Sequence, residues 1–421
     1  MISQKMKQMV EQSAAMSAMF TEGKRLAAIY GAENVYDFGI GNPNVKAPAS
    51  VNATAIEILQ NMDSLKVHSY TDSSGIPAAR KAIAESLNRR FGTNYDESNL
   101  VMTVGAAGGL NVILKVLLDA GDEVLTFAPY FGEYDNYVMN VGGVLHPIPP
   151  NPPDFLPDVD ALSACITPKT KAIIINSPNN PTGVIYDAGT IEKIAAVLRQ
   201  KSAEYGTDIY IIADEPYREL AYDGVEVPYI PNFYENTIVA YSFSKSLSLP
   251  GDRIGYLVIP STVSDFAEVS MGAAIANRVL GFVNAPALQQ MVVARCCEET
   301  TDVAFYNANR ELLYNALQEY GYTCAKPQGA FYLFVKALED DDKAFCEKAK
   351  EYRLLVTPGS AFGCKGYVRI SYCVSRETIE NSSELFTEIR DEIEKYKKER
   401  EELTQRHKEF LQHREDLSKH M

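Results

Sequence analysis

Histidine is scarce in this sequence. Of the five histidines, His407, His413 and His420 lie in the charged last part of the chain, which leaves only His68 and His146 for the rest. A catalytic triad built on histidine and a histidine-rich zinc site are both disfavoured by this distribution. If the protein is an enzyme, another type of side chain must move its protons.

Positive charge, long apolar runs and paired cysteines are also lacking. The chain has 40 Lys and Arg against 55 Asp and Glu, a net charge of −15, whereas nucleic acid binding needs a basic surface. No apolar run approaches the ~20 residues of a membrane-spanning helix. Gln, Glu and Ser interrupt the first 20 residues, unlike a signal peptide. The seven cysteines are scattered without C-x-x-C spacing, which is typical of reduced thiols in the cytoplasm and offers no metal framework.

What the sequence does have is a series of apolar strands that alternate with helical patterns. A strand, a glycine-rich turn, a helix and a second strand follow one another over residues 99–131, and three more apolar strands follow within 171–246. Continuous apolar strands separated by helices predict an α/β domain with a mainly parallel sheet. Polar residues cluster just after these strands, where open α/β sheets bind ligands.

The pattern changes near residue 286. Helices there precede short strands at 329–337 and 367–374, which predicts a smaller α+β domain. We therefore expect a large domain over 50–285, a small domain made of 1–49 and 286–395, and a charged helical tail over 396–421.

The expected tail has a weak heptad pattern. Its apolar residues recur at Ile389, Ile393, Tyr396, Leu403, Phe410 and Leu417, while Arg400, His407 and Arg414 hold the intervening heptad positions. Two interpretations stay open, a helix that is simply solvated and a helix that binds a partner.

Four short motifs hold the candidate site residues. They are "SPNNPTG" with Asn180, "ADEPYREL" with Asp214 and Tyr217, "SFSKSLSLPGDRIG" with Lys245, and "GYVRISYC" with Arg369. Each motif alone is ambiguous, because an Asn before Pro or an Asp at a strand end is common in turns and caps. Their order along the chain and their positions after apolar strands point to one shared site.

The third motif carries a resemblance to a known family. Ser242 to Gly255 match S-x-S-K-x-x-x-x-x-G-x-R-x-G, with Gly251 and Arg253 in place, and N-P-T-G and D-x-x-Y precede it in order. The chain is similar in this respect to class I/II aminotransferases of the aspartate aminotransferase fold, which use pyridoxal 5′-phosphate, and the resemblance covers residues 20–395. It implies a large domain with a mainly parallel sheet and a smaller α+β domain.

The resemblance also implies roles for the residues that meet the cofactor ring. Lys245 would form a Schiff base with the aldehyde and move the proton of the amino-acid substrate, which requires a pKa below the usual value of about 10.4. Asp214 would face the pyridine nitrogen, and Tyr217 and Asn180 would share the phenolic oxygen. Phe131 would stack on the ring, and a place in the core is the less favoured alternative.

Further residues match the positions that bind the phosphate and the substrate. Ala106 and Ala107 would offer backbone N–H groups at a helix N-terminus, beside Ser242 and Arg253. Tyr70 would reach the phosphate from the neighbouring subunit, so the resemblance implies a homodimer with shared active sites. Arg369 would bind the substrate α-carboxylate with Asn180 and the backbone of Gly41. The substrates would be an L-amino acid and a 2-oxo acid such as 2-oxoglutarate.

The resemblance leaves the amino donor open. Ala107 stands where related enzymes for aspartate have a lysine that binds the distal carboxylate, and Arg278 is either its replacement or an ordinary surface arginine. Beside an aminotransferase, a carbon–sulfur lyase or synthase on the same fold and a cofactor-binding regulatory protein remain alternatives.

Overall fold

The computed structural model describes residues 2–419, and it describes their side chains except at 12–20 and 415–419. Its main feature is a seven-stranded sheet with the order β2-β8-β7-β6-β5-β3-β4. Neighbouring strands run parallel except that β8 is antiparallel to both β2 and β7. The strands are β2 (Leu100–Thr103), β3 (Glu123–Phe127), β4 (Val144–Ile148), β5 (Thr170–Asn176), β6 (Tyr210–Asp214), β7 (Thr237–Ser242) and β8 (Gly255–Val258). The predicted α/β fold with a mainly parallel sheet is confirmed.

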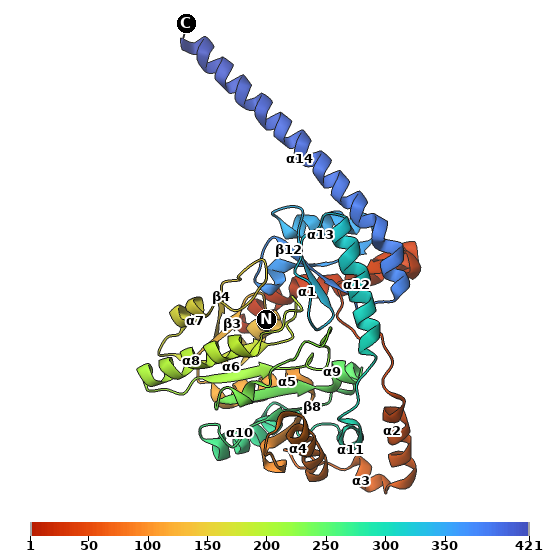
Figure 1. Ribbon diagram of the computed structural model, residues 1–421, viewed down its shortest axis with the longest axis vertical. Coiled ribbons are helices and arrows are strands. Elements are labelled where there is room, and N and C mark those ends of the chain that lie inside the picture. The colour runs from red at the N-terminus through yellow and green to blue at the C-terminus, as the bar shows by residue number, and fades with distance from the viewer. Residues whose placement is uncertain (1, 420–421) are drawn as a thin grey trace.

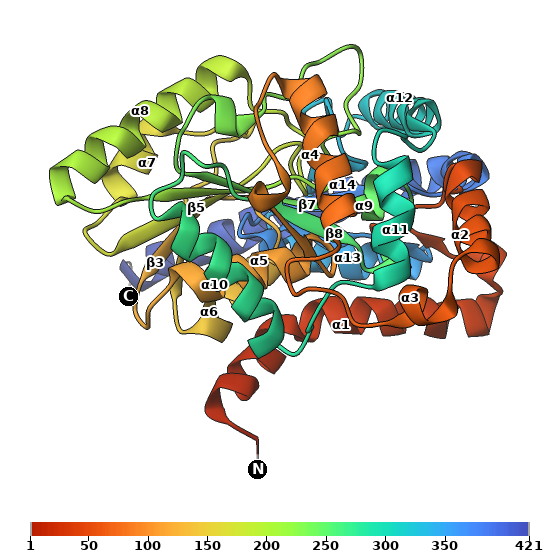
Figure 2. The ribbon, with the colours of Figure 1, turned by 90° about the horizontal axis from the view of Figure 1, so that it is seen from below.

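Helices cover both faces of this sheet (Figures 1 and 2). One face carries α4 (Pro77–Phe91), α7 (Val159–Cys165) and α8 (Ala188–Tyr205). The other carries α5 (Gly105–Leu117), α6 (Glu133–Val141) and α10 (Phe266–Val279). The helices α2 (Ala49–Asn61), α3 (Ser64–His68) and α11 (Ala287–Cys296) pack together beside the sheet, and the short α9 (Phe243–Ser246) follows β7.

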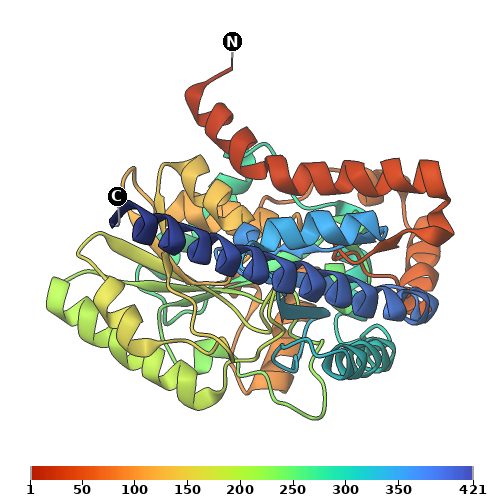
Figure 3. The same cartoon turned by 90° about the horizontal axis from the view of Figure 1, so that it is seen from above.

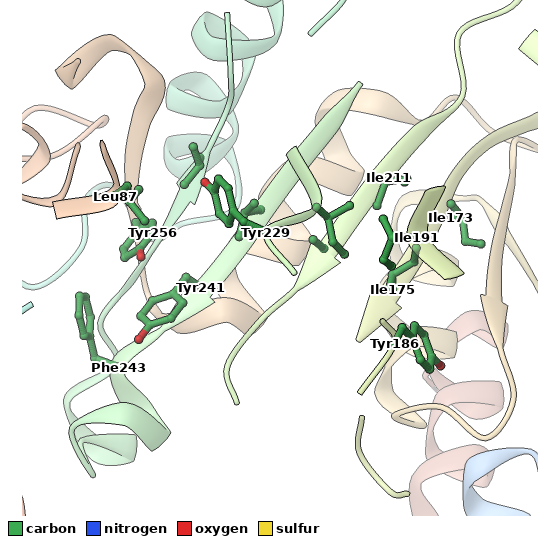
Figure 4. Close-up of a cluster of buried hydrophobic side chains, with 14 of the residues drawn as sticks. Leu87, Ile173, Ile175, Tyr186, Ile191, Ile211, Tyr229, Tyr241, Phe243 and Tyr256 are labelled. Atoms are coloured by element: carbon green, nitrogen blue, oxygen red, sulfur yellow. The ribbon is translucent and has the colours of Figure 1, made fainter. Parts of the chain in front are cut away.

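The apolar strands are buried on both faces because side chains alternate along a strand. Ile173 and Ile175 of β5 pack in one core cluster, whereas Ile174 between them packs in the cluster on the opposite face. Figure 4 shows the first cluster, where Ile191 of α8 lies near the β5 isoleucines and Tyr241 lies near Tyr256. This two-sided core holds the carboxyl ends of β5, β6 and β7 in fixed positions.

In the view of Figure 1, a second group of elements lies above the large sheet. Strands β9 (Tyr332–Lys336), β11 (Thr357–Pro358) and β12 (Tyr367–Ser371) form an antiparallel sheet, and β1 (Tyr36–Asp37) pairs parallel with β10 (Leu354–Leu355). The helices here are α1 (Gln4–Tyr30), α12 (Val303–Glu319), α13 (Asp342–Glu351) and α14 (Arg376–Lys419). In the view of Figure 3, α13 runs between α1 and α14. The expected domain limits at 49/50, 285/286 and 395/396 stay a prediction.

The last helix is unusually long. Its first part packs on the smaller sheet through Phe386, Ile389 and Ile393, which are buried. Beyond Ile393 the same helix continues without a break and projects away from the body (Figure 1). Leu417 and His420 of the expected tail lie outside the described side chains. No helix in the described part of the chain is both long and apolar enough to cross a membrane.

Candidate active site

Most of the residues singled out by the sequence line one cavity. It has a volume of about 350 Å³, and Asn176, Asp214 and Ser242, the last residues of β5, β6 and β7, line it. Open α/β sheets bind ligands at this edge. The cavity brings together eleven of the twelve expected residues, namely Gly41, Ala106, Ala107, Phe131, Asn180, Asp214, Tyr217, Ser242, Lys245, Arg253 and Arg369.

Lys245 projects into the cavity from α9. Its Nζ donates a hydrogen bond to the carbonyl oxygen of Gly41 at 2.8 Å and lies 5.3 Å from the centre of the Phe331 ring. Burial disfavours the charged ammonium form and, with the nearby Arg369 and Arg253, lowers the pKa of Lys245 to about 8. The amine is therefore available as a nucleophile and base at a pH where a surface lysine is fully protonated.

Asp214 ends β6 and is 5% exposed. The hydroxyl of Tyr134 donates a hydrogen bond to its Oδ2 at 2.5 Å, while its Oδ1 is buried without a hydrogen-bond partner among the described residues. Burial raises the pKa of Asp214 to about 7 in spite of the hydrogen bond from Tyr134. A buried carboxylate oxygen without a partner is costly, so this atom fits a hydrogen-bond donor from a ligand, as a protonated ring nitrogen would supply.

Arg369 lies in β12 and is 7% exposed. Its guanidinium donates to Oδ1 of Asn180 at 3.1 Å and to the carbonyl oxygen of Gly39 at 2.6 Å. Its guanidinium carbon lies 4.6 Å from the ring centre of Tyr332 and 4.8 Å from that of Phe362. These contacts hold a planar cation against the cavity, an arrangement that suits a carboxylate.

Two tyrosines join Arg369 to the strand end of β6. Tyr217, three residues after Asp214, forms a hydroxyl–hydroxyl hydrogen bond of 2.8 Å with Tyr332. Tyr332 stacks on Arg369 at the same time, as given above. A Cβ atom at Gly41 would overlap the Tyr332 hydroxyl, so only glycine allows this approach.

The turn between β2 and α5 forms an anion cradle with Arg253. Helix α5 begins at Gly105, and Ala106 and Ala107 of its first turn have N–H groups without partners inside the helix. Arg253 donates to the carbonyl oxygen of Val104 at 3.1 Å, and a Cβ atom on Gly105 would lie 2.9 Å from its Nη2. Positive charge and helical N–H groups therefore converge at one end of the cavity, which fits a phosphate.

Serine hydroxyls and an aromatic ring complete the cavity wall. Ser242 Oγ and Ser244 Oγ are 2.7 Å apart, so these hydroxyls are already ordered by each other. Phe131 lines the cavity and packs edge-on against Tyr134, with ring centres 5.6 Å apart. Its ring is therefore part of the site rather than of the core alone.

Comparison with known proteins gives this site a family. The pattern described as "Aminotransferase class I and II" matches residues 33–385. The chain belongs to the class I and II aminotransferase family. It is therefore an aminotransferase, which moves an amino group from an L-amino acid to a 2-oxo acid, and the family depends on pyridoxal phosphate.

Individual relatives agree with this assignment. The aminotransferase is 30% identical to the aspartate/prephenate aminotransferase of Thermus thermophilus over 354 residues, 83% of this chain and 89% of that protein. It is 30% identical to the aspartate aminotransferase of Thermotoga maritima over 382 residues, 90% of this chain and 95% of that protein. The crystal structure of an amino transferase from Eubacterium rectale has a TM-score of 0.90 at 48% identity and covers 93% of this chain and 99% of its own.

Two residues of interest lie outside the cavity of the aminotransferase. Tyr70 is 88% exposed and borders a surface depression that Val283 also lines. Arg278 is an exposed residue of α10 and does not line the cavity. Within one chain neither residue lines the cavity, so the roles expected for them depend on a second subunit and stay predictions.

Sequence reasoning missed several residues that line the aminotransferase cavity, among them Tyr137, Ser244, Tyr332 and Thr357. It also missed Tyr134, which is buried and supports Asp214 through a hydrogen bond. Ser244 stood inside the S-x-S-K motif and could have been found there. Tyr332 lies in an apolar strand, where a tyrosine is usually a core residue. The only signal at Tyr134 was its position three residues after Phe131.

Proposed function

We propose that the cavity binds pyridoxal 5′-phosphate with its ring nitrogen against Asp214 and its aldehyde carbon next to Lys245. The observation that carries the proposal is the combination of an amine with a lowered pKa, Lys245, and a buried, partner-free oxygen, Oδ1 of Asp214, in the walls of one cavity. When bound, the cofactor supplies an aldehyde that condenses with amines and a ring that withdraws electrons from the substrate Cα.

Lys245 acts as nucleophile and as base. Because its pKa is lowered to about 8, a much larger share of Nζ is unprotonated near neutral pH than in a free lysine, whose pKa is about 10.4. With the cofactor bound, Lys245 would supply the amine that attaches to its aldehyde, and Nζ, once free, would move the proton of the substrate Cα. Its hydrogen bond to the Gly41 carbonyl orients Nζ for these steps.

The remaining polar residues hold the two reactants. Tyr217 and Asn180 would donate to the phenolic oxygen of the cofactor, and Asp214 would accept from its ring nitrogen. The N–H groups of Ala106 and Ala107 would bind the phosphate together with Ser242 and Arg253, and Phe131 would stack on the ring. Arg369 binds the α-carboxylate with help from Asn180 and Gly41, which fixes the Cα–H bond near Lys245.

We also propose a homodimer in which Tyr70 of one chain contacts the phosphate in the other. Tyr70 is 88% exposed, and Leu65 in the neighbouring α3 is 78% exposed. In α10, Met271 is 64% exposed and Val279 is 65% exposed. Such exposed apolar side chains are typical of a surface that another subunit covers. All seven cysteines are free thiols, which favours the cytoplasm as the location.

For the substrates, we propose a broad range of amino donors with 2-oxoglutarate as an acceptor. The Thermus and Thermotoga relatives are named for aspartate, yet the cations that line this cavity are Lys245, Arg253 and Arg369, each with a role above. A distal carboxylate would therefore need a cation from the second subunit, and Arg278 is the candidate. Without one, burying that carboxylate costs several kcal/mol and neutral donors are preferred.

A half-reaction tests the proposal. The purified protein loaded with pyridoxal phosphate is mixed with single L-amino acids, without any 2-oxo acid, and the absorbance of the bound cofactor is followed. Conversion of the aldehyde form into the amine form, reversed by 2-oxoglutarate, is the expected result. Release of ammonia with the aldehyde form regained would instead indicate a lyase.

A further inference from the structure

The projecting part of α14 has no role in the site described above. Every described side chain from 394 to 414 is exposed, while Ile389 and Ile393 just before this stretch are buried on the body. Its internal hydrogen bonds are local, such as Thr404 to the Arg400 carbonyl and Gln405 to Glu409. It also lies beyond residue 385, where the match to the family pattern ends.

A free-standing helix of this kind is energetically marginal. Helices in water gain little stability from propensity alone, and in proteins most of it comes from packing an apolar face. Tyr396, Leu403 and Phe410 are 52%, 64% and 63% exposed and recur every seven residues, so they form one stripe along the helix. The stripe starts at the edge of the body, where the Tyr396 ring centre lies 5.5 Å from Nζ of Lys348 in α13. The stripe calls for a second helix to cover it.

Basic residues alternate with the apolar residues of the stripe. Each apolar residue is followed four positions later by a basic one, and these are Arg400, His407 and Arg414. A parallel pair of these helices would place each of the two arginines against its own copy. Like charges in a seam are repulsive, so the pattern disfavours parallel pairing.

An antiparallel pair resolves the conflict. We propose that Tyr396–Arg414 of α14 pairs antiparallel with the same segment of a second copy of this chain, with the two-fold axis level with Gln405. Arg400 then lies against the partner's Phe410, Arg414 against the partner's Tyr396, and Leu403 against the partner's His407. Each arginine meets an aromatic ring, a favourable cation–π contact, and the paired segment is about 28 Å long.

The flanking positions are compatible with this register. Glu399 faces the partner's His413, and Thr404 faces the partner's Thr404 across the two-fold axis. Arg406 meets its own copy, which is the one repulsive contact, and Glu402, four residues before it in the same helix, partly offsets its charge.

A membrane surface fits the helix less well. A helix that lies on a membrane needs a wide apolar face, whereas this one is a single narrow stripe, the pattern of a coiled-coil seam. The partner that matches the alternation of arginine and aromatic residues is the same helix of a second copy, in antiparallel orientation.

Sedimentation of the loaded enzyme tests the pairing. The full chain is compared with a chain that ends at Lys395, over a wide range of protein concentration. We expect the average mass of the full chain to rise at least twofold above that of the truncated chain, with unchanged transaminase activity in both. Equal masses at every concentration, or association only with vesicles of anionic lipid, would overturn the proposal.

A charge swap shows whether the named contacts are responsible. Phe410→Arg places arginine against arginine and should return the full chain to the mass of the truncated one. Adding Arg400→Phe restores an arginine–aromatic pair and should restore the higher mass. Lys408→Glu, on the back of the helix, is the matched control and should change nothing. A Phe410→Arg chain that still associates would contradict the register.

A cross-link distinguishes antiparallel from parallel pairing. A short bis-maleimide should join two Thr404→Cys chains far above the wild-type background, because position 404 faces its own copy only in the antiparallel pair. Gln405→Cys, on the outer side, is the control and should stay at the background. Equal cross-linking of the two variants would rule out the antiparallel arrangement.

Discussion

The hydroxyl of Tyr134 donates a hydrogen bond to one carboxylate oxygen of Asp214, and the other oxygen is buried without a partner among the described residues. One donor does not compensate for the burial, so the pKa of Asp214 rises to about 7. The site is therefore strained electrostatically until a ligand offers a donor to Oδ1, and binding of that ligand removes the cost.

This strain predicts a pH dependence of stability in the cofactor-free protein. The folded pKa of about 7 exceeds the unfolded value of 3.8, so the native state retains a proton that the unfolded state has lost. Stability should fall as pH rises through this window, by about 1.4 kcal/mol per unit from this group alone. In urea unfolding, the free energy of unfolding of Asp214→Asn should increase relative to that of the wild type as the pH is raised from 4 to 7. An equal slope for both proteins, or one that survives saturation with pyridoxal phosphate, would contradict this account.

Lys245 should be the point of covalent attachment. Lys245→Ala should abolish multiple turnovers, and borohydride should no longer fix the cofactor to the protein. Lys193→Ala, at an exposed lysine of α8, is the matched control and should behave as wild type. Mass spectrometry of the reduced protein reads the result, and an intact adduct in the Lys245→Ala chain would place the attachment elsewhere.

The ring and the hydroxyl of Tyr332 should have separate effects, the ring on Arg369 and the hydroxyl on Tyr217. Tyr332→Leu removes the ring under Arg369 and should raise KM for the amino acid roughly 5- to 30-fold, the value of one cation–π contact. Tyr332→Phe keeps the ring but removes the hydrogen bond to Tyr217, so KM should stay constant while the pH profile of the bound cofactor's absorbance shifts. Steady-state kinetics and a spectroscopic titration separate the two effects. Identical behaviour of the two variants would mean that Tyr332 only fills space.

Mixed dimers test the role of Tyr70. Chains with Lys245→Ala and chains with Tyr70→Ala should each be nearly inactive. If the sites are shared, a hybrid of the two contains one site with both residues intact, so mixing after partial unfolding and refolding should restore part of the activity. Refolding each variant alone is the control. No recovery in a verified hybrid would place Tyr70 outside the partner's site.

Arg278 tests the choice of amino donor. If it binds a distal carboxylate across the subunit boundary, Arg278→Ala should lower kcat/KM for aspartate about 100-fold, near 3 kcal/mol, and affect alanine far less. Arg295→Ala, at another exposed arginine, serves as the control. An equal loss for aspartate and alanine would indicate a structural role, and no loss for either would leave Arg278 at the surface.

The sequence located the site because its chemistry is concentrated at strand ends. A lysine or aspartate directly after a buried strand is conspicuous, and the parallel pairing of β5, β6 and β7 then brings Asn180, Asp214 and Lys245 to one edge. The reversal of β8 carried no such signal, because its apolar run reads the same in either direction.

The residues that support the site, Tyr134 and Tyr332, were harder to predict because they are largely apolar. Tyr134 and Tyr332 act through a hydroxyl on an otherwise apolar side chain, so their surroundings resemble an ordinary core until the three-dimensional contacts are known. A helical tail over 396–421 was expected, but the start of this helix at Arg376 and its unbroken course from the small sheet into the projecting segment follow only from the structure.

The hydrogen bond from Arg369 to the carbonyl of Gly39 joins residues 330 positions apart. It has a consequence for the growing polypeptide on the ribosome. At typical elongation rates, the segment around Gly39 emerges on the order of 20–60 s before Arg369 is synthesised. All strands of the seven-stranded sheet and the anion cradle are synthesised in this interval. The part of the site that we propose to hold the phosphate is therefore made before the part that we propose to hold the amino acid.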